Sequence, residues 1–315
     1  MQVLIVGGAG FLGANLVRRC LQEPDVRVTV VDSLDPRFMS RRESLPDVPE
    51  RIQFLQGDLL SETDISAAVV DQDVIFDCAG QTSHPVSMDQ PYLDLQLNCL
   101  GSLRLLEAVR HHNPTASVVF TSSSTVVGPA VSRAVDEDHP ERPRDVYSAN
   151  KGVAEKYFAI YHEKYGLRTV SLRLPNLFGP YGKPDARFGF INYFIGLARS
   201  GRPIQVFGEG RQTRNVMYVE DAAEVLWRVA GDARLFGSTY FATSDDHRSI
   251  TEIAEAVDEC FAGGGVEHVA WSAGREQIEV GNVSLSSARL REISGWRPRF
   301  DLRSGLERMR DVLEP

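Results

Sequence analysis

A tyrosine and a lysine are spaced so that they could move a proton together. Tyr147 and Lys151 stand at positions i and i+4 of a helix-like stretch, Val146–Tyr165, which places the phenol and the ammonium on one helix face. A free tyrosine, with a pKa of about 10, is a poor base at neutral pH. A cation about 4 Å away contributes about 4 kcal/mol at an effective dielectric constant of about 20, which lowers a pKa by about three units. The pair is therefore a candidate acid–base centre.

Hydroxyl side chains precede this helix at the end of an apolar run. Val118–Phe120 continues into Thr121-Ser-Ser123-Ser-Thr125. A hydroxyl such as that of Ser123 can orient a substrate oxygen toward the phenol. A Tyr/Lys pair at this spacing occurs by chance in many helices. Its position directly after a hydroxyl-rich strand end is what makes it a specific signal. The alternative is an amphipathic surface helix with an incidental tyrosine and lysine.

A glycine-rich turn near the N-terminus has the features of a dinucleotide-binding site. The apolar run Val3–Val6 leads directly into Gly7-Gly-Ala-Gly10-Phe-Leu-Gly13 and then into a helix-like stretch. A side chain at Gly7 or Gly10 would obstruct the tight turn or an approaching diphosphate, and Gly13 lets the helix pack close to the sheet. The helix N-terminus offers free N–H groups to the anion. We expect the cofactor to contact Gly7, Gly10, Phe11 and Leu12.

Three further strand ends fit the same site. Asp32 ends the second run, where its carboxylate can accept both ribose hydroxyls of an adenosine and would repel a 2′-phosphate, which favours NAD over NADP. The alternative role for Asp32 is to cap a turn before Ser33. Asp58-Leu59 closes the third run and could contact adenine. Ala79-Gly80 closes the fourth, with small residues where a ribose would lie.

Alternating strand-like and helix-like stretches must position these groups. The apolar runs are Val3–Val6, Val28–Val31, Ile52–Leu55, Val74–Phe76, Val118–Phe120 and Thr169–Leu174. The helix-like stretches are Gly13–Leu21, Glu62–Val70, Tyr92–His112 and Val146–Tyr165. Strands that are apolar throughout are typical of a parallel sheet covered on both faces. Repeated β-α-β order predicts a doubly wound α/β fold that binds ligands at the carboxyl ends of its strands.

The second part of the chain is more irregular. We expect an NAD-binding Rossmann domain over residues 1–175 and a smaller mixed α/β substrate-binding lobe over 176–315, packed on the first, with some segments returning to the sheet. Ser249-Ile-Thr-Glu252 is typical of a capping box at a helix start, and a last helix is predicted over Leu302–Leu313.

Composition excludes several classes of protein. A net charge of −9 disfavours broad nucleic-acid binding, which needs a basic surface. No apolar stretch approaches the roughly 20 residues that span a bilayer, and the N-terminus has no basic region followed by a cleavage site. The four cysteines are scattered without a CxxC pair, which indicates reduced thiols and no zinc site. We therefore expect a soluble, cytoplasmic protein that binds no metal, membrane or nucleic acid.

These motifs occur in an order that resembles a known family. The chain is similar to the extended short-chain dehydrogenase/reductases, in particular to their NAD-dependent nucleotide-sugar epimerase and dehydratase branch. The resemblance extends beyond the segments above to Leu172-Arg-Leu-Pro-Asn176-Leu-Phe-Gly-Pro180, Arg211-Gln-Thr-Arg214-Asn-Val-Met-Tyr-Val-Glu-Asp221 and Gly295-Trp-Arg-Pro298. It implies that Ser123, Tyr147 and Lys151 are catalytic.

The resemblance also implies how cofactor and substrate are held. Pro175 would lie beside the nicotinamide, and the segment Pro203-Ile-Gln205-Val-Phe-Gly208 would line the nucleotide base. Ser83 and Thr125 would face the sugar. The nucleotide diphosphate would be held by Asn176, Arg214 and Arg275. Guanidinium groups suit a diphosphate because they donate bidentate, charge-assisted hydrogen bonds.

The strand end after Ser123 bears on the reaction. Members of this branch begin by oxidising a sugar hydroxyl, usually at C4, and its dehydratases carry an Asp-Glu pair two residues beyond the serine. Here the stretch reads Ser124-Thr125-Val126 and provides neither the general acid nor the general base that elimination of water needs. Epimerisation needs only hydride removal, rotation of the keto-sugar and hydride return. We therefore favour a nucleotide-sugar C4 epimerase; the alternatives are a dehydratase or ketosugar reductase of the family and a non-enzymatic dinucleotide sensor.

Two positions depart from the family pattern. Val127 replaces a tyrosine that usually stands near the sugar. Gln81-Thr-Ser83-His84-Pro is unfamiliar in a loop that usually faces the sugar, so Ser83 and His84 are candidates for setting specificity. The alternative for His84 is an ordinary surface histidine.

Two helices carry more apolar residues than one stripe against a sheet requires. Related enzymes pair such helices into a four-helix bundle, which predicts a homodimer; the rival interpretation is that the substrate lobe covers them. The residues are Leu93, Leu97, Leu100, Leu103 and Leu106 in the first helix and Tyr157, Phe158 and Tyr161 in the second.

Overall fold

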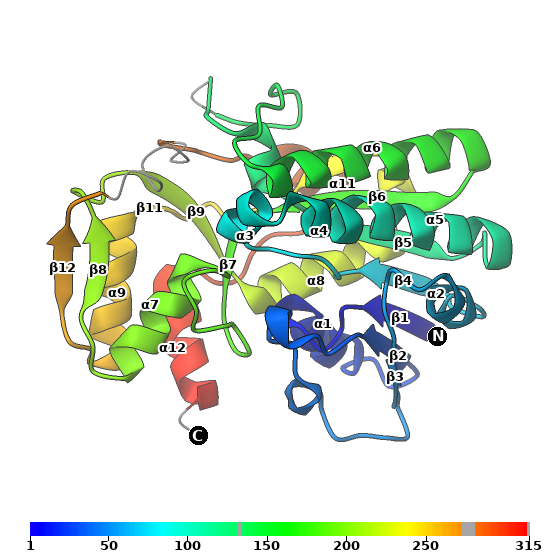
Figure 1. Cartoon of the computed structure of the whole chain (residues 1–315), viewed down its shortest axis with the longest axis horizontal. Helices are drawn as coiled ribbons and strands as arrows, with labels where there is room; N and C mark the ends of the chain where they lie inside the picture. Colours follow the sequence, from blue (N-terminus) through cyan, green and yellow to red (C-terminus); the bar gives the residue numbers. More distant parts are fainter. Residues whose placement is uncertain (132–133, 272–280, 314–315) are drawn as a thin grey trace.

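A parallel sheet of seven strands forms the centre of the protein (Figure 1). The computed structural model describes residues 1–131, 134–271 and 281–313. The strands follow the order β10-β6-β5-β4-β1-β2-β3, and each neighbouring pair is parallel. Their bounds are β1 Gln2–Val6, β2 Arg27–Asp32, β3 Ile52–Gln56, β4 Val74–Asp77, β5 Ser117–Ser123, β6 Arg168–Leu174 and β10 Thr239–Phe241. This is the doubly wound Rossmann order with one strand added at an edge.

Helices cover both faces of this sheet, which explains why its strands are apolar throughout. On one face, α1 (Phe11–Cys20) and α8 (Val219–Ala230) pack with the strands in one apolar cluster, to which Leu16 and Leu226 contribute. On the other face, α2 (Glu62–Ala68), α5 (Gly101–His112) and α6 (Val146–Tyr165) form a second cluster that includes Phe158. Figure 1 shows α5 and α6 on one side of the sheet and α1 and α8 on the other.

The rest of the C-terminal part builds a smaller lobe with its own apolar cluster. It contains a three-stranded sheet of order β11-β9-β7 and a parallel pair of β8 and β12. The strands are β7 Asn176–Phe178, β8 Ile204–Phe207, β9 Thr213–Tyr218, β11 His247–Ser249 and β12 Val266–Val269. The helices are α7 Phe190–Arg199, α9 Ile250–Phe261 and α12 Leu302–Leu313, with α11 Ala288–Ser294 packed near β10.

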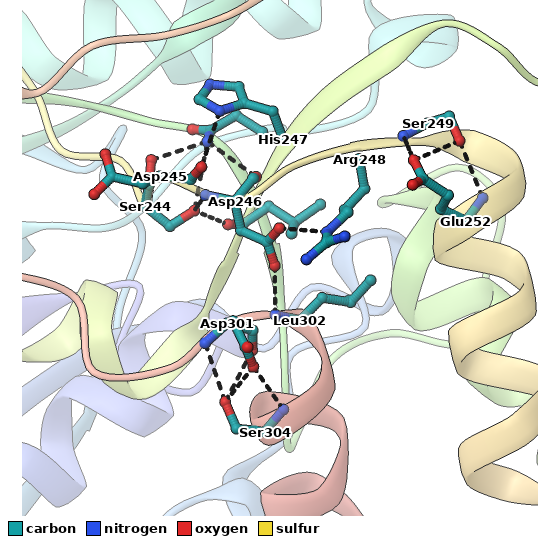
Figure 2. Close-up of polar contacts among 12 residues, drawn as sticks. Ser244, Asp245, Asp246, His247, Arg248, Ser249, Glu252, Asp301, Leu302 and Ser304 are labelled. Carbon is teal, nitrogen blue, oxygen red and sulfur yellow. Dashed lines mark hydrogen bonds and ion pairs between the residues drawn. The ribbon is translucent and has the colours of Figure 1, made fainter.

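Polar contacts fix the starts of two helices of this lobe (Figure 2). Ser249 and Glu252 form the capping box that the sequence predicted at the start of α9. Asp301 caps α12, because its Oδ1 accepts a hydrogen bond from the Ser304 N–H at 2.8 Å. Asp246 Oδ2 accepts another from the Leu302 N–H at 2.6 Å. These bonds satisfy N–H groups that have no partner inside a helix.

One predicted helix is interrupted. In place of a single helix over Tyr92–His112, the chain forms α4 (Pro91–Leu95), a π-helical turn η3 (Gln96–Leu100) and α5. Within the turn Asn98 is buried, and its Nδ2 donates to the carbonyl oxygen of Gln81 at 2.8 Å. Turns of this kind are often found at functional sites. None of the helices in the described part of the chain combines the length and apolar character that crossing a bilayer requires.

Candidate active site

A cavity of about 680 Å³ lies at the carboxyl ends of the central strands, with walls from both lobes. It brings together residues that the sequence places far apart, from the glycine turn to β8 and β9. Of the residues predicted as site residues, its lining contains Gly7, Gly10, Phe11, Leu12, Asp32, Asp58, Leu59, Ala79, Gly80, Ser123, Thr125, Tyr147, Lys151, Pro175, Asn176, Gln205 and Arg214.

The glycine turn leaves room for a dinucleotide. Gly7 has a φ of +79°, and a Cβ there would lie 2.7 Å from the backbone of Ala79, so only glycine fits. A Cβ at Gly13 would lie 2.3 Å from the carbonyl oxygen of Gly7, which shows how closely α1 packs on the turn. Gly10 is the N-cap of α1 and has no side chain to cap it, so the first N–H groups of the helix face a place for a diphosphate.

Asp32 orders a turn, as one of the two sequence-based interpretations expected, and its place in the cavity wall is compatible with the other. It lines the cavity, and its Oδ1 also accepts hydrogen bonds from the Leu34 N–H and the Ser40 hydroxyl, both at 2.9 Å. Its Oδ2 accepts one from the Ala9 N–H at 3.0 Å. A carboxylate has about four acceptor positions, so the carboxylate that orders this turn can still accept a ribose hydroxyl.

Lys183 lines the same cavity and was not expected from the sequence, because its loop carries no motif. Burial lowers the pKa of its ammonium to about 8, although the charges of Asp32 and Asp185 oppose this shift. Lys183 thus adds a cation to the wall that Asp32 belongs to.

Ser123, Tyr147 and Lys151 come together at the end of β5 and the start of α6. All three are more than nine-tenths buried and line the cavity. Ser123 Oγ lies 2.8 Å from Thr125 Oγ1, which also accepts a hydrogen bond from the Ser148 hydroxyl at 2.8 Å. This chain of hydroxyls holds the serine in place. Lys151 Nζ donates to the carbonyl oxygen of Thr121 at 3.0 Å, which ties the helix to the strand.

The pKa shift of Tyr147 beside Lys151 differs from the lowering that the sequence led us to expect. Burial raises the pKa of the Tyr147 phenol, the hydrogen bond with Ser123 acts to lower it, and the charges of Asp145 and Asp94 add to the rise. Burial also lowers the pKa of Lys151, which the charges of Asp77 and Asp94 oppose. A strongly lowered phenol pKa is therefore not a property of the protein chain alone.

A histidine–aspartate pair lies beside the phenol. His84 Nδ1 is 2.7 Å from Asp145 Oδ2, and the His84 and Tyr147 rings meet edge to face with centroids 5.0 Å apart. Asp145 is also the N-cap of α6, where its Oδ1 accepts from the Ser148 N–H at 2.8 Å. The sequence singled out His84 but missed Asp145, which looks like an ordinary helix cap until the fold brings the two together.

Buried amides support the loop that carries His84. Gln81 Nε2 donates to Asp94 Oδ2 at 2.8 Å, and Asn150 Nδ2 of α6 donates to Asp94 Oδ1 at 2.8 Å. Asn98 joins this network through the carbonyl oxygen of Gln81. A Cβ on Gly80 would lie 2.3 Å from Asn98 Oδ1, so the loop, the π-helical turn and α6 are closely fitted.

Three further residues singled out from the sequence are Ser83, Val127 and Arg275, and the structure bears on the first two. Ser83 is fully buried, and its hydroxyl caps α3 (His84–Asp89) by accepting from the Val86 N–H; its neighbours Thr82 and His84 line the cavity in its place. The expectation that Ser83 touches the sugar is thus corrected. Val127 is buried in a small apolar cluster with Phe241, so an apolar contact replaces the polar one of a tyrosine. Arg275 lies outside the described residues.

The far end of the cavity combines amide, guanidinium and aromatic groups. Asn176 Nδ2 donates to the carbonyl oxygen of Asn215 at 3.2 Å, and Arg214 Nη1 donates to that of Gly281 at 2.7 Å. Phe207 and Trp271, whose ring centroids are 5.7 Å apart, also line this cavity. Such rings offer a stacking surface for a base. The segment that the resemblance placed at the base contains Phe207, whereas Trp271 was not singled out, since a lone aromatic residue carries no recognisable spacing.

In the described part of the chain, no group of three or more His, Cys, Asp and Glu side chains is arranged to hold a metal ion. The doubly wound sheet, the glycine turn and the buried Ser/Tyr/Lys set define a dinucleotide-dependent enzyme. The family model described as "NAD dependent epimerase/dehydratase family" matches residues 3–240. The chain belongs to this family, and NAD is its cofactor.

Relatives of known activity include both reactions in the family name. A UDP-glucose 4-epimerase of Mycolicibacterium smegmatis is 28% identical over 310 residues, 97% of this chain and 96% of the relative. A dTDP-glucose 4,6-dehydratase of Mycobacterium tuberculosis is 32% identical over 250 residues, 79% of this chain and 74% of the relative. A structure of the Thermus thermophilus UDP-glucose 4-epimerase with NAD has a TM-score of 0.88 at 28% identity and covers 99% of this chain and 98% of its own.

Proposed function

We propose that this protein epimerises the sugar of a nucleoside diphosphate sugar at C4. The proposal rests on the side chains in the cavity wall around Ser123. The buried serine, tyrosine and lysine lie together there, and the strand end beyond Ser123 supplies hydroxyl groups. The Thr125 hydroxyl is hydrogen-bonded to those of Ser123 and Ser148. The stretch Ser124-Thr125-Val126 contains neither member of the Asp-Glu pair expected of a dehydratase.

The residues divide the work between proton transfer and positioning. When bound, NAD supplies the hydride acceptor and donor. Tyr147 takes the proton of the C4 hydroxyl as that carbon is oxidised and gives it back after the keto-sugar has turned over. Ser123 holds the sugar oxygen toward the phenol. Lys151 lies one helical turn beyond Tyr147 in the same cavity wall, where its ammonium would serve the phenolate and the nicotinamide ribose.

The other end of the cavity suits the nucleotide. Asn176 and Arg214 would hold the diphosphate, since a guanidinium donates charge-assisted hydrogen bonds to phosphate oxygens. Gln205, on β8, and the rings of Phe207 and Trp271 would hold the base. Gly7, Asp32 and Asp58 would hold the adenosine half of NAD.

A dehydratase of the same family is the second candidate. The 32% identity with a dTDP-glucose 4,6-dehydratase favours it. Incubation of the NAD-bound protein with a panel of UDP-, dTDP-, GDP- and CDP-sugars, followed by NMR, separates the two. An inverted C4 without net NADH supports the epimerase, loss of water supports the dehydratase, and stoichiometric NADH indicates a dehydrogenase. An unchanged panel contradicts both candidates.

We also propose that two copies of the chain form a homodimer through α4, η3 and α6. Some of the apolar residues named from the sequence face the sheet instead, since Leu106, Phe158 and Tyr161 are buried in the second cluster. The apolar side chains that are exposed on these elements are Tyr92, Leu95, Leu100, Val153, Ile160 and Tyr165. They form a surface that a second copy can cover.

A further inference from the structure

His84 lies in the cavity wall next to Tyr147 but outside the Ser123–Tyr147–Lys151 set. It stands at the first position of α3, a helix that follows the end of β4, and its ring meets that of Tyr147 at 81° with centroids 5.0 Å apart. His84, Asp145 and Tyr147 all line the cavity. A titratable ring at this distance from the proposed base can reach the same part of a bound sugar.

Asp145 fixes the orientation of this ring. Its Oδ2 lies 2.7 Å from His84 Nδ1, and the Ser148 N–H holds its other oxygen. Burial acts to raise the pKa of Asp145. The hydrogen bond and charge of His84, together with the hydrogen bonds of Ser148, outweigh burial and hold this pKa below its usual value. An ionised Asp145 places the ring proton on Nδ1, which leaves Nε2 as the nitrogen that can exchange a proton with a ligand.

The rest of the ring is open to the cavity. The His84 side chain is 36% exposed, and no side chain or backbone group of residues 1–131, 134–271 and 281–313 forms a hydrogen bond with its Nε2. A carboxylate that orients a histidine, with the other ring nitrogen open to a cavity, is the arrangement of a general base.

We propose that His84, oriented by Asp145, is a second acid–base residue that removes and returns a proton on a sugar carbon next to the C4 ketone. The inference rests on the proposed function, which supplies the ketone. Nε2 takes a proton from C3 or C5, the electrons of that C–H bond form the enolate of the ketone, and the imidazolium gives a proton back to the same carbon. The step is redox-neutral and needs no further reactant.

This step gives the site a base for a ring carbon, which the strand end beyond Ser123 does not provide. A C4 epimerase needs no carbon deprotonation, whereas inversion next to the ketone or elimination does. The substrate class remains a nucleoside diphosphate sugar, and its C3 or C5 hydrogen exchanges with solvent while C4 is oxidised.

A ready-made ketosugar tests the step without the hydride transfers. The NAD-bound full chain is incubated in D2O with UDP- and dTDP-linked 4-keto-6-deoxyglucose, and the C3 and C5 proton signals are followed by NMR. Exchange at one of these carbons should exceed the rate in buffer. His84→Gln should lower the enzymatic rate by roughly 10²–10⁴-fold, the range of lost acid–base catalysis. Tyr147→Phe should keep more of it than His84→Gln does, because the carbon base remains and Ser123 still holds the ketone oxygen.

Matched variants separate chemistry from folding. His112→Gln changes an exposed histidine at the end of α5 and should leave exchange unchanged. Asp145→Asn keeps a good helix cap but removes the charge, and should slow exchange less than His84→Gln does. His84→Asn, checked by NAD binding and thermal unfolding, replaces His84→Gln if that variant does not fold.

The outcomes are distinct. A bound ketosugar that exchanges no faster than in buffer overturns this inference and leaves the C4 epimerase standing. Exchange that is lost in Tyr147→Phe and kept in His84→Gln assigns the base to Tyr147 and also overturns it. Failure of both ketosugars to bind, measured by equilibrium dialysis, overturns this inference for UDP- and dTDP-linked sugars, while the proposed function is tested separately by the nucleotide-sugar panel.

Discussion

Replacing Tyr147 by phenylalanine removes one oxygen and leaves the ring in contact with His84. Since the ring is almost fully buried, the fold and NAD affinity should survive. Turnover of the nucleotide sugar should fall by roughly 10²–10⁴-fold because the acid–base group is gone. The rate is measured by NMR on the substrate found in the panel. Near-normal turnover in Tyr147→Phe would remove the proposed mechanism.

Ser123 should act on the same phenol through its hydrogen bond. That bond lowers the pKa of Tyr147 against the effect of burial, so Ser123→Ala should raise it. A base works only when deprotonated, so kcat/KM falls as the pH drops below its pKa. The acidic limb of the pH profile should therefore move to higher pH in Ser123→Ala, with a smaller loss of rate at high pH than Tyr147→Phe shows. If the acidic limb of the pH profile does not move, Ser123 has no effect on the pKa of the Tyr147 phenol.

We predict that Asp32 sets the preference for NAD over NADP. Asp32→Asn keeps one acceptor oxygen for the turn but removes the charge that faces the ribose. Charge-assisted hydrogen bonds contribute about 1.5–3 kcal/mol, so NAD binding should weaken roughly 10–100-fold while discrimination against NADP relaxes. Isothermal titration with both cofactors measures this. Tighter binding of NADP than of NAD by the unchanged protein would show that Asp32 has another role.

At the scale of elements, a buried ion pair joins the strand and helix that carry the site. Arg173 of β6 donates to Glu155 of α6 at 2.9 and 2.7 Å, and both side chains are nearly fully buried. Arg173→Met leaves the Glu155 carboxylate with the Ser122 hydroxyl but without its cation, and breaking a buried ion pair in this way typically costs about 3–5 kcal/mol. Lys156→Met breaks an exposed pair with Glu141 and should cost less than about 1 kcal/mol. Urea unfolding of both variants compares the two free energies; equal losses would contradict the argument.

Elements whose ends are set locally could be predicted, and those set by distant contacts could not. α6 has the predicted limits because Asp145 caps its start and Gly166, with a φ of +71°, ends it. The interruption at η3 depends on Asn98 reaching Gln81, a contact between separate segments. The same holds for the site: the glycine turn and Tyr147/Lys151 have local spacing, whereas the His84–Asp145 pair arises only when β4 and β5 lie side by side.

At the scale of the molecule, the cavity is made by two lobes that are interleaved along the chain. β10 and α8 come from the C-terminal part, yet β10 pairs with β6 and α8 packs on α1. The nucleotide side of the cavity is therefore tied to the cofactor side through the sheet itself. Pro180 reinforces this tie, since its carbonyl oxygen accepts from Asn15 Nδ2 of α1 at 2.9 Å.

The proposed dimer is a prediction about the outer surface of this body. Val153 and Ile160 are 38% and 47% exposed and lie two turns apart on one face of α6. This helix packs against α4 and η3, which carry the exposed Leu95 and Leu100. Burying apolar surface contributes about 25 cal/mol per Å², whereas an arginine at its centre would bring an unpaired charge into the interface. Ile160→Arg should therefore shift the protein from dimer to monomer at micromolar concentration, as measured by light scattering. Val312→Arg, at a 38% exposed position of α12 on the other lobe, should leave the mass unchanged. A monomer in the unchanged protein would leave this face without the partner proposed for it.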